Sequence, residues 1–366
     1  MSTASNSGAT LRQRYHELLQ QQPNSRARNA AQALGVSEAE LLACQVGETV
    51  SVLRHDPQAL LSRLEACGDV MALTRNASCV HERHGVYTNL SFSRHGPMHM
   101  GLAVNEDIDL RMFLDQWRYS FTVTESGEHG ERRSLQFFDR YGEAVHKVYF
   151  TERSNLPAWR QLLDDFFAAD LQSDTLSVEP LPTAIAARPD AEIDSAALER
   201  DWRALQDTHD FFPLLKRHGV QREQALRLVP RDLAYPVATT AARAMLQAAA
   251  EQKCPIMVFV GNRGCIQIHT GLVENLRPTG PWFNVLDPRF NLHLMETAIA
   301  RCWITRKPSV DGTVTALEVF DSSGELIVQF FGKRKPGIPE LQQWRDIVAA
   351  LPAHESSSAR VAAAVD

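Results

Sequence analysis

A histidine set among aromatic and basic residues is the clearest candidate for chemistry in this chain. Residues 201–218 read DWRALQDTHDFFPLLKRH. If this segment is one helix, Leu205, His209 and Phe212 share a face, because residues four and seven apart nearly coincide. An imidazole beside aromatic rings suits an axial ligand of haem iron, since the ring nitrogen holds the metal while apolar groups cover the porphyrin. The alternative is a histidine that is merely packed or on the surface, which is the commoner fate of a lone histidine.

Several cationic or polar side chains could bind the two carboxylates of haem through charge-assisted hydrogen bonds. Arg111 stands out because it interrupts the mostly apolar run 108–114. The alternative for each of these residues is an ordinary surface charge, which is what most arginines and lysines are. The candidates are Arg111, Arg222, Lys307 and Arg334, together with Gln329.

Three other patterns have both a functional and a structural interpretation. Four histidines show H-x2-H and H-x3-H spacings that a transition metal could use, but no cysteine or acidic cluster joins them in a known pattern. Residues 30–44 contain the Gly-Val-Ser turn of a helix-turn-helix, although they lack a basic recognition helix. Cys254 precedes a proline as in some haem-sensing elements, but this pair better fits the start of a strand. The four histidines are His81, His84, His95 and His99.

Composition narrows the class of protein. The 44% hydrophobic and 22% charged residues are ordinary for a globular chain, and 366 residues exceed the usual size of one core, which favours two domains. A net charge of −6 argues against a general nucleic-acid binder. The N-terminal residues carry no apolar signal segment, and no apolar run approaches the roughly 18 residues of a membrane span. Six scattered cysteines suit reduced thiols. We therefore expect a soluble, cytoplasmic protein without membrane insertion.

The chain repeats itself at an offset of 182 residues. Residues 134–143, SLQFFDRYGE, match residues 316–325, ALEVFDSSGE, so that Asp139 pairs with Asp321 and Gly142 with Gly324. Further upstream, the pair Arg75-Asn76 resembles Gly261-Asn262 at an offset of 186. Shared sequence at one nearly constant offset indicates a tandem duplication.

Each half shows the same order of predicted elements: helices, then strands, then a closing helix. This segregation favours an α+β fold with large antiparallel sheets over a Rossmann fold. The predicted helices are 11–22, 27–34, 38–44, 157–169, 196–218, 222–228 and 340–350, and the predicted strands are 143–150, 256–260, 265–269, 282–285, 317–320 and 325–331. We expect an N-terminal half at 1–170, a linker at 171–195, a C-terminal half with the haem ligand at 196–352, and a disordered tail at 353–366.

The chain resembles the haemin transport or haemin-degrading factor family, of the HemS/ChuS type, over almost its whole length. The most specific segments are DTHDFF at 207–212, FVGNRGC at 259–265, ETAIA at 296–300 and WITRKP at 303–308. In the first half, DLR at 109–111 and QFFD at 136–139 also match. The resemblance implies two similar α+β halves, with haem b bound between helices and the C-terminal sheet.

The resemblance also implies roles for individual residues. By position, His209 is similar to the family's proximal iron ligand, Arg111 to its distal arginine, and Phe113 to the aromatic residue against the porphyrin. Phe331 is a departure, because some relatives carry tyrosine there; some also carry further histidines where this chain has Asp210 and Phe212. Arg222, Lys307, Gln329 and Arg334 match polar residues around the haem edge and its propionates.

Two functions follow from the resemblance. The first is a carrier that accepts haem from the importer and passes it to a degrading enzyme such as a haem oxygenase. The second is a haem-degrading enzyme that works with an external electron donor. A DNA-binding regulator using residues 30–44 is a third hypothesis, which the acidic composition argues against.

Overall fold

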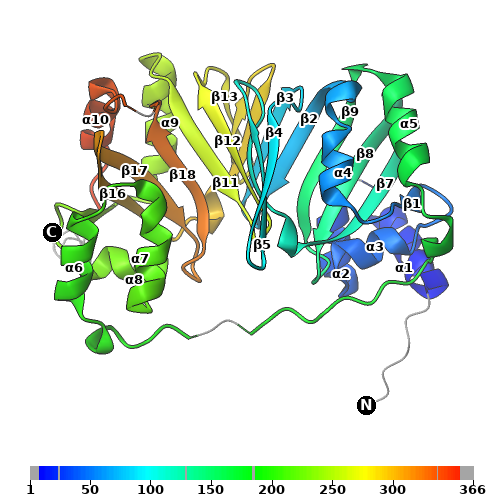
Figure 1. Cartoon of the computed structure of the whole chain (residues 1–366), viewed down its shortest axis with the longest axis horizontal. Helices are drawn as coiled ribbons and strands as arrows, with labels where there is room; N and C mark the ends of the chain where they lie inside the picture. The colour runs from blue at the N-terminus through cyan, green and yellow to red at the C-terminus, as the bar shows by residue number, and fades with distance from the viewer. Residues whose placement is uncertain (1–7, 24, 128–129, 184–185, 336, 355–366) are drawn as a thin grey trace, which may run out of the picture. The chain divides into compact units, whose positions relative to one another are not determined.

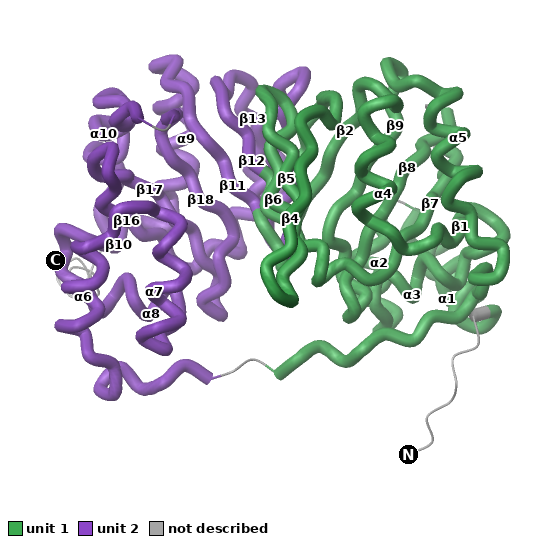
Figure 2. The backbone as a smooth tube through the Cα atoms, viewed as in Figure 1, with its two compact units in different colours: residues 1–75, 82–183, 261–267 green, residues 76–81, 184–260, 268–366 purple. Residues whose placement is uncertain are grey.

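The computed structural model describes residues 8–23, 25–127, 130–183, 186–335 and 337–354. The chain divides into two compact units, shown in green and purple in Figure 2. Unit 1 comprises residues 1–75, 82–183 and 261–267, and unit 2 comprises residues 76–81, 184–260 and 268–366. Within the described ranges, no helix is both long and apolar enough to span a membrane.

Unit 1 contains five helices and most of nine strands (Figure 1). Its helices are α1 Gly8–Gln21, α2 Ala27–Leu34, α3 Glu38–Ala43, α4 Pro57–Ser62 and α5 Leu156–Phe166. Its strands are β1 Val50–Val52, β2 Gly68–Arg75, β3 Cys79–Gly85, β4 Leu90–His95, β5 Met98–Val104, β6 Asp109–Phe113, β7 Trp117–Gly127, β8 Gly130–Asp139 and β9 Ala144–Ser154. Strands β1-β7-β8-β9-β2 lie side by side in that order, and β4-β5-β6 form a meander.

Both faces of this five-stranded run are covered by helices. On one face, α4 and α5 pack through Leu60 and Trp159 against Phe137. On the other face, α3 packs through Ala39 against Phe138. Neighbouring residues of a strand point to opposite faces, so Phe137 and Phe138 belong to two separate hydrophobic cores.

Unit 2 has the same inventory (Figure 1). Its helices are α6 Ser195–Arg203, α7 Phe211–His218, α8 Arg222–Leu228, α9 Ala241–Glu251 and α10 Gln342–Ala349. Its strands are β10 Ala234–Val237, β11 Ile256–Gly261, β12 Cys265–Gly271, β13 Leu276–Thr279, β14 Trp282–Leu286, β15 Phe290–Met295, β16 Arg301–Ser309, β17 Gly312–Phe320 and β18 Leu326–Gly332. Strands β10-β16-β17-β18-β11 lie side by side, and β13-β14-β15 form the meander.

The cores of unit 2 repeat those of unit 1. Helices α9 and α10 pack through Met245 and Trp344 against Val319 on one face of the sheet. Helices α6 to α8 pack through residues such as Trp202 against Phe320 on the other face. The second face is the one that carries the candidate residues of the C-terminal half.

Local detail confirms the tandem duplication and the α+β class, with two antiparallel sheets of nine strands. The carboxylate of Asp139 accepts the N–H groups of residues 141 and 143, and that of Asp321 accepts those of residues 323 and 325. Both turns close on a glycine with positive φ, +76° at Gly142 and +86° at Gly324. A register shift also recurs at matched places, between residues 137 and 138 and between 319 and 320.

Some elements were not predicted from the sequence. Two helices had no predicted counterpart, namely α4, which is short, and α9, whose alanine-rich run is typical of a helix. The predicted ranges also left out strands β1 to β8, β10, β13, β15 and β16. The predicted tail, 353–366, lies outside the described residues from 355 onward.

A fully buried histidine lies in the core of unit 1. Nε2 of His146 is 2.6 Å from the hydroxyl oxygen of Tyr87, and Nδ1 is 2.9 Å from that of Thr74. All three side chains are buried. Burial lowers the pKa of His146 to about 3 because the imidazolium would lose its hydration.

This burial predicts acid sensitivity. As the pH falls below about 6.5, this histidine becomes protonated in the unfolded chain, whereas it stays neutral in the folded protein. The contribution to stability is therefore fully present above that pH and is lost as the pH falls towards 3. The cost at pH 5 is roughly 2 kcal/mol. In urea unfolding, we expect the wild type to lose roughly 2 kcal/mol more than His146→Gln between pH 7 and pH 5. The exposed His16 provides the control His16→Gln, and equal losses in wild type and His146→Gln would contradict the prediction.

Candidate functional site

His209 lies at a break between two helices. Helix α6 ends at Arg203, a 3-10 turn spans Thr208–Asp210, and α7 begins at Phe211. The single helix predicted for residues 196–218 is therefore wrong, and so is the shared face of Leu205, His209 and Phe212. Leu205 is buried, whereas the other two are exposed.

Tertiary contacts cause this break. The indole N–H of Trp202 donates to the carbonyl of Arg306 at 2.9 Å, and the N–H of Val310 donates to the carbonyl of Gln206 at 2.9 Å. These bonds hold the chain against β16 and the turn that follows it. The carboxylate of Asp207 then accepts the backbone N–H of His209 at 2.8 Å, which caps the 3-10 turn.

The imidazole of His209 is exposed and oriented by a carboxylate. Its side chain is 87% exposed, and Nδ1 lies 2.6 Å from Oδ1 of Asp207. Within the part of the chain that the structure describes, Nε2 makes no hydrogen bond. The backbone N–H and ring of His209 hold the pKa of the Asp207 carboxyl below its usual range, and the Arg334 cation adds to this effect. A carboxylate on one ring nitrogen and an available second nitrogen is the usual arrangement of a metal-binding histidine.

Two exposed apolar side chains are associated with the segment that carries His209, one nearby in the chain and one through a backbone hydrogen bond. Phe212, three residues further on, is 71% exposed. Val310, in the turn bonded to Gln206, is 76% exposed. Neither side chain contributes to the core, and both are available for contact with a ligand.

Arg222 and Lys307 meet at a buried carboxylate that sequence reasoning missed. Glu318 of β17 is fully buried, and its oxygens lie 2.7 and 2.9 Å from the guanidinium of Arg222 and 2.7 Å from Nζ of Lys307. Burial alone would raise the pKa of Glu318, but the two cations lower it. Two positive charges against one negative charge leave the group with a net positive charge. The available signal was a glutamate inside the apolar run 316–320.

The remaining candidates of unit 2 lie on or just after β18. Gln329 pairs in register with Glu318 of β17, and the ring of Phe331 is 4.9 Å from that of Phe259. Arg334 follows the strand and lies 3.7 Å from the carboxylate of Asp311, the neighbour of exposed Val310. Unit 2 thus holds six of the predicted residues, namely His209, Arg222, Lys307, Gln329, Phe331 and Arg334.

Arg111 and Phe113 belong to β6 of unit 1. The guanidinium of Arg111 is ion-paired with Asp109, and its side chain is 31% exposed. The N–H of Phe113 donates to the carbonyl of Gly264 at 2.9 Å. Arg111 is therefore an ion-paired charge within an apolar stretch.

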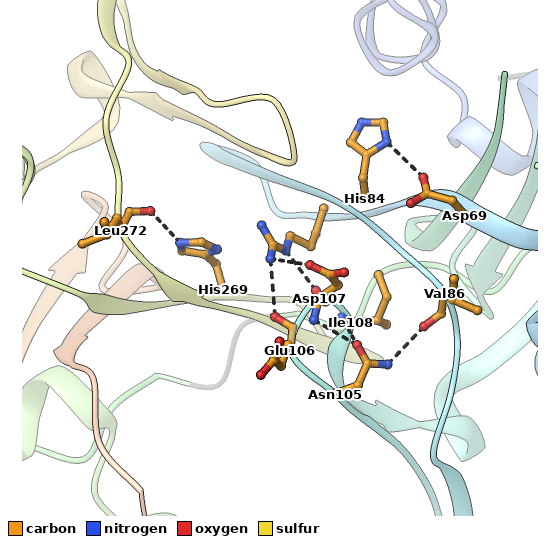
Figure 3. Close-up of polar contacts among 10 residues, drawn as sticks. Asp69, His84, Val86, Asn105, Glu106, Asp107, Ile108, His269 and Leu272 are labelled. Atoms are coloured by element: carbon orange, nitrogen blue, oxygen red, sulfur yellow. Dashed lines mark hydrogen bonds and ion pairs between the residues drawn. The ribbon is translucent and has the colours of Figure 1, made fainter. Parts of the chain in front are cut away.

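The histidines with metal-like spacing do not form a cluster. The ring of His84 faces the carboxylate of Asp69 (Figure 3), with 3.9 Å between Nδ1 and Oδ1, and Nε2 of His99 lies 3.0 Å from Oε1 of Gln58. The ring of His81 packs against Phe290 at 5.0 Å. Across the described ranges, no three histidine, cysteine or acidic side chains are placed to hold a metal ion together.

The two other sequence patterns have structural roles. In the candidate helix-turn-helix, Glu38, Ala39 and residues 41–43 of α3 are buried, so this helix cannot enter a DNA groove. The Cys254-Pro255 pair directly precedes the strand β11, as expected. All six cysteines are buried free thiols.

Taken together, unit 2 presents an exposed imidazole fixed by a carboxylate, exposed apolar side chains, and cations on or beside the same sheet. This donor set fits a flat, apolar ligand with a metal centre and carboxylate groups, which is the chemistry of haem.

Comparison with known proteins agrees with this geometry. The model of the haemin-degrading HemS.ChuX domain matches residues 35–166 and again residues 219–351. The hemin transport protein HmuS of Yersinia pestis is 46% identical over 344 residues, which cover 94% of this chain and 97% of that protein.

Two solved structures share the whole fold. Holo-PhuS, a heme-binding protein from Pseudomonas aeruginosa, has 49% identity and a TM-score of 0.91, with coverage of 95% of this chain and 100% of that chain. ChuS, an E. coli heme oxygenase, has 40% identity and a TM-score of 0.84, with coverage of 93% and 99%. The resemblance found in the sequence is confirmed: the chain belongs to the haemin-degrading HemS/ChuX domain family.

Proposed function

We propose that this chain is a cytoplasmic haem-binding protein of haem uptake, which accepts imported haem and passes it on for degradation or use. The observation that carries the proposal is His209, an 87% exposed imidazole whose Nδ1 is held by Asp207. Its Nε2 would be the axial ligand of the haem iron. The relatives named as a hemin transport protein and a heme-binding protein support this function.

Cations of unit 2 would receive the haem propionates. The group of Arg222, Lys307 and Glu318 keeps a net positive charge, and the Arg334 side chain is 21% exposed. Burial lowers the pKa of Lys307 to about 8, and Glu318 opposes that effect, so the ammonium stays charged at neutral pH. The roles of Arg111 and Phe113, in unit 1, stay predictions from the resemblance.

The cytoplasmic part of the proposal rests on the cysteines, because six buried free thiols suit a reducing compartment. The partners we propose are the haem importer as donor and a haem oxygenase as acceptor. The second candidate function is haem degradation by this chain itself, which the similarity to the heme oxygenase ChuS favours. The haem would supply oxygen activation in that case, and the protein would bind and orient it.

The first prediction concerns the iron ligand. We expect haemin titration of the wild type to saturate near one haem per chain with a sharp Soret band. His209→Ala should bind at least tenfold more weakly and shift the band, because it lacks the axial nitrogen. The control is His95→Ala, which removes an exposed histidine of unit 1. Identical titrations of wild type and His209→Ala would rule out His209 as the ligand.

A second prediction tests the propionate contacts. Arg334→Gln should lower the affinity for haemin roughly tenfold, because a charge-assisted hydrogen bond is lost. Haemin dimethyl ester has no carboxylates, so its affinity should be the same for wild type and variant. Arg227→Gln removes an ion-paired arginine of α8 as the control. An equal loss with the ester would show that Arg334 does not bind the propionates.

The third prediction separates carrier from enzyme. With oxygen and an electron donor, the haem-loaded carrier should only bleach, and catalase should abolish the bleaching because free peroxide causes it. Absorption spectra and chromatography of the tetrapyrrole product provide the measurement. Formation of biliverdin that continues in the presence of catalase would favour the enzyme instead.

A further inference from the structure

We propose that Asp207 is a positioning residue that makes the haem site selective for ferric over ferrous haem. This inference rests on the proposed function, because it takes His209 as the iron ligand. Its starting point is the pair of hydrogen bonds from one carboxylate oxygen, Oδ1, to the backbone N–H and to Nδ1 of His209, at 2.8 and 2.6 Å.

The bond to the backbone N–H fixes the position of the His209 main chain, and the bond to Nδ1 fixes the orientation of its ring. Asp207 has extended backbone angles, φ −139° and ψ 135°, and caps the 3-10 turn of residues 208–210. Because the same oxygen contacts both the backbone and the ring, rotation of the ring would break the contact at Nδ1. The tautomer is thereby set as well: Nδ1 carries the proton, and the lone pair lies on Nε2.

The carboxylate also changes the ring as a ligand. A hydrogen bond from Nδ1–H to a negative oxygen moves electron density into the imidazole and raises its basicity at Nε2. A more anionic ligand stabilises the more positive metal, so Fe(III) gains more than Fe(II). A backbone carbonyl in the same place would orient the ring but add no net charge. Because this chain has a carboxylate there, we expect the site to prefer ferric haem over ferrous haem.

The influence of Asp207 on the iron is short-range. Asp207 itself is 59% exposed, so water screens its long-range field. Its effect on the iron therefore depends on the direct 2.6 Å contact with the ring rather than on net charge nearby.

This dependence provides a matched pair of variants. Asp207→Asn keeps an oxygen that can accept both N–H groups but removes the negative charge. Asp210→Asn removes the same charge three residues along the chain, from a carboxylate that is not bonded to the ring in the described structure. Both residues are exposed, and thermal unfolding with circular dichroism checks that each variant keeps the wild-type fold.

The experiment measures binding of ferric haemin and of ferrous haem, the reduction potential of the bound haem, and the iron–histidine stretching frequency by resonance Raman spectroscopy. For Asp207→Asn we expect the ferric affinity to fall about tenfold more than the ferrous affinity. By the one-electron relation, this raises the potential by about 59 mV. The stretching frequency should fall, and Asp210→Asn should match the wild type.

Two results would overturn the inference. Asp207→Asn could equal the wild type in affinity ratio, potential and stretching frequency, or it could lose ferric and ferrous affinity equally at an unchanged frequency, which is the mark of a purely structural cap. Failure of the proposed function looks different, because wild type and His209→Ala would then bind haem alike. That result would overturn both proposals.

Discussion

The buried carboxylate of Glu318 is the interaction on which the site of unit 2 depends. Two cations can stay next to the core of this sheet only because Glu318 lies between them, 2.7 Å from each. The same cations pack on the ring of Phe211, at 5.2 Å for Arg222 and 4.4 Å for Lys307. Phe211 begins α7, directly after the turn that carries His209. One charge cluster thus joins α8, the sheet and the start of α7, and so fixes the position of the exposed imidazole.

Unit 1 has a similar cluster, but its carboxylate lies on the helix and both of its cations lie on the sheet. The first residue of α8 is Arg222, which binds the carboxylate of Glu318 on β17. The first residue of α3 is Glu38, which is ion-paired with Lys147 of β9 and with Arg75 of β2. Both helices begin with a capping box. Each unit thus holds one buried carboxylate between two cations at this place, and the duplicated halves differ in which element carries the carboxylate rather than in the net charge of the cluster.

The sequence was most informative where short-range rules act. The turns at Asp139 and Asp321 were predictable because an aspartate followed by two residues and a glycine builds the same hydrogen bonds in any context. The break before His209 was not, because it depends on Trp202 and Val310 bonding to residues far along the chain. Glu318 was missed because its partners come from a helix and another strand, and the roles of Arg111 and Phe113 came from the resemblance alone.

The buried cysteines have a consequence for the redox chemistry of such a protein. Burial raises the pKa of Cys44 and Cys67 to about 11, and that of Cys265 and Cys302 to about 12. At neutral pH these thiols are protonated, and only the thiolate is a strong iron ligand or a ready target of peroxide. Buried, protonated sulfur atoms would therefore neither compete with a histidine for haem iron nor react first with oxidants generated by such iron. A chain that handles a pro-oxidant can in this way carry six cysteines without forming mixed disulfides or sulfenic acids.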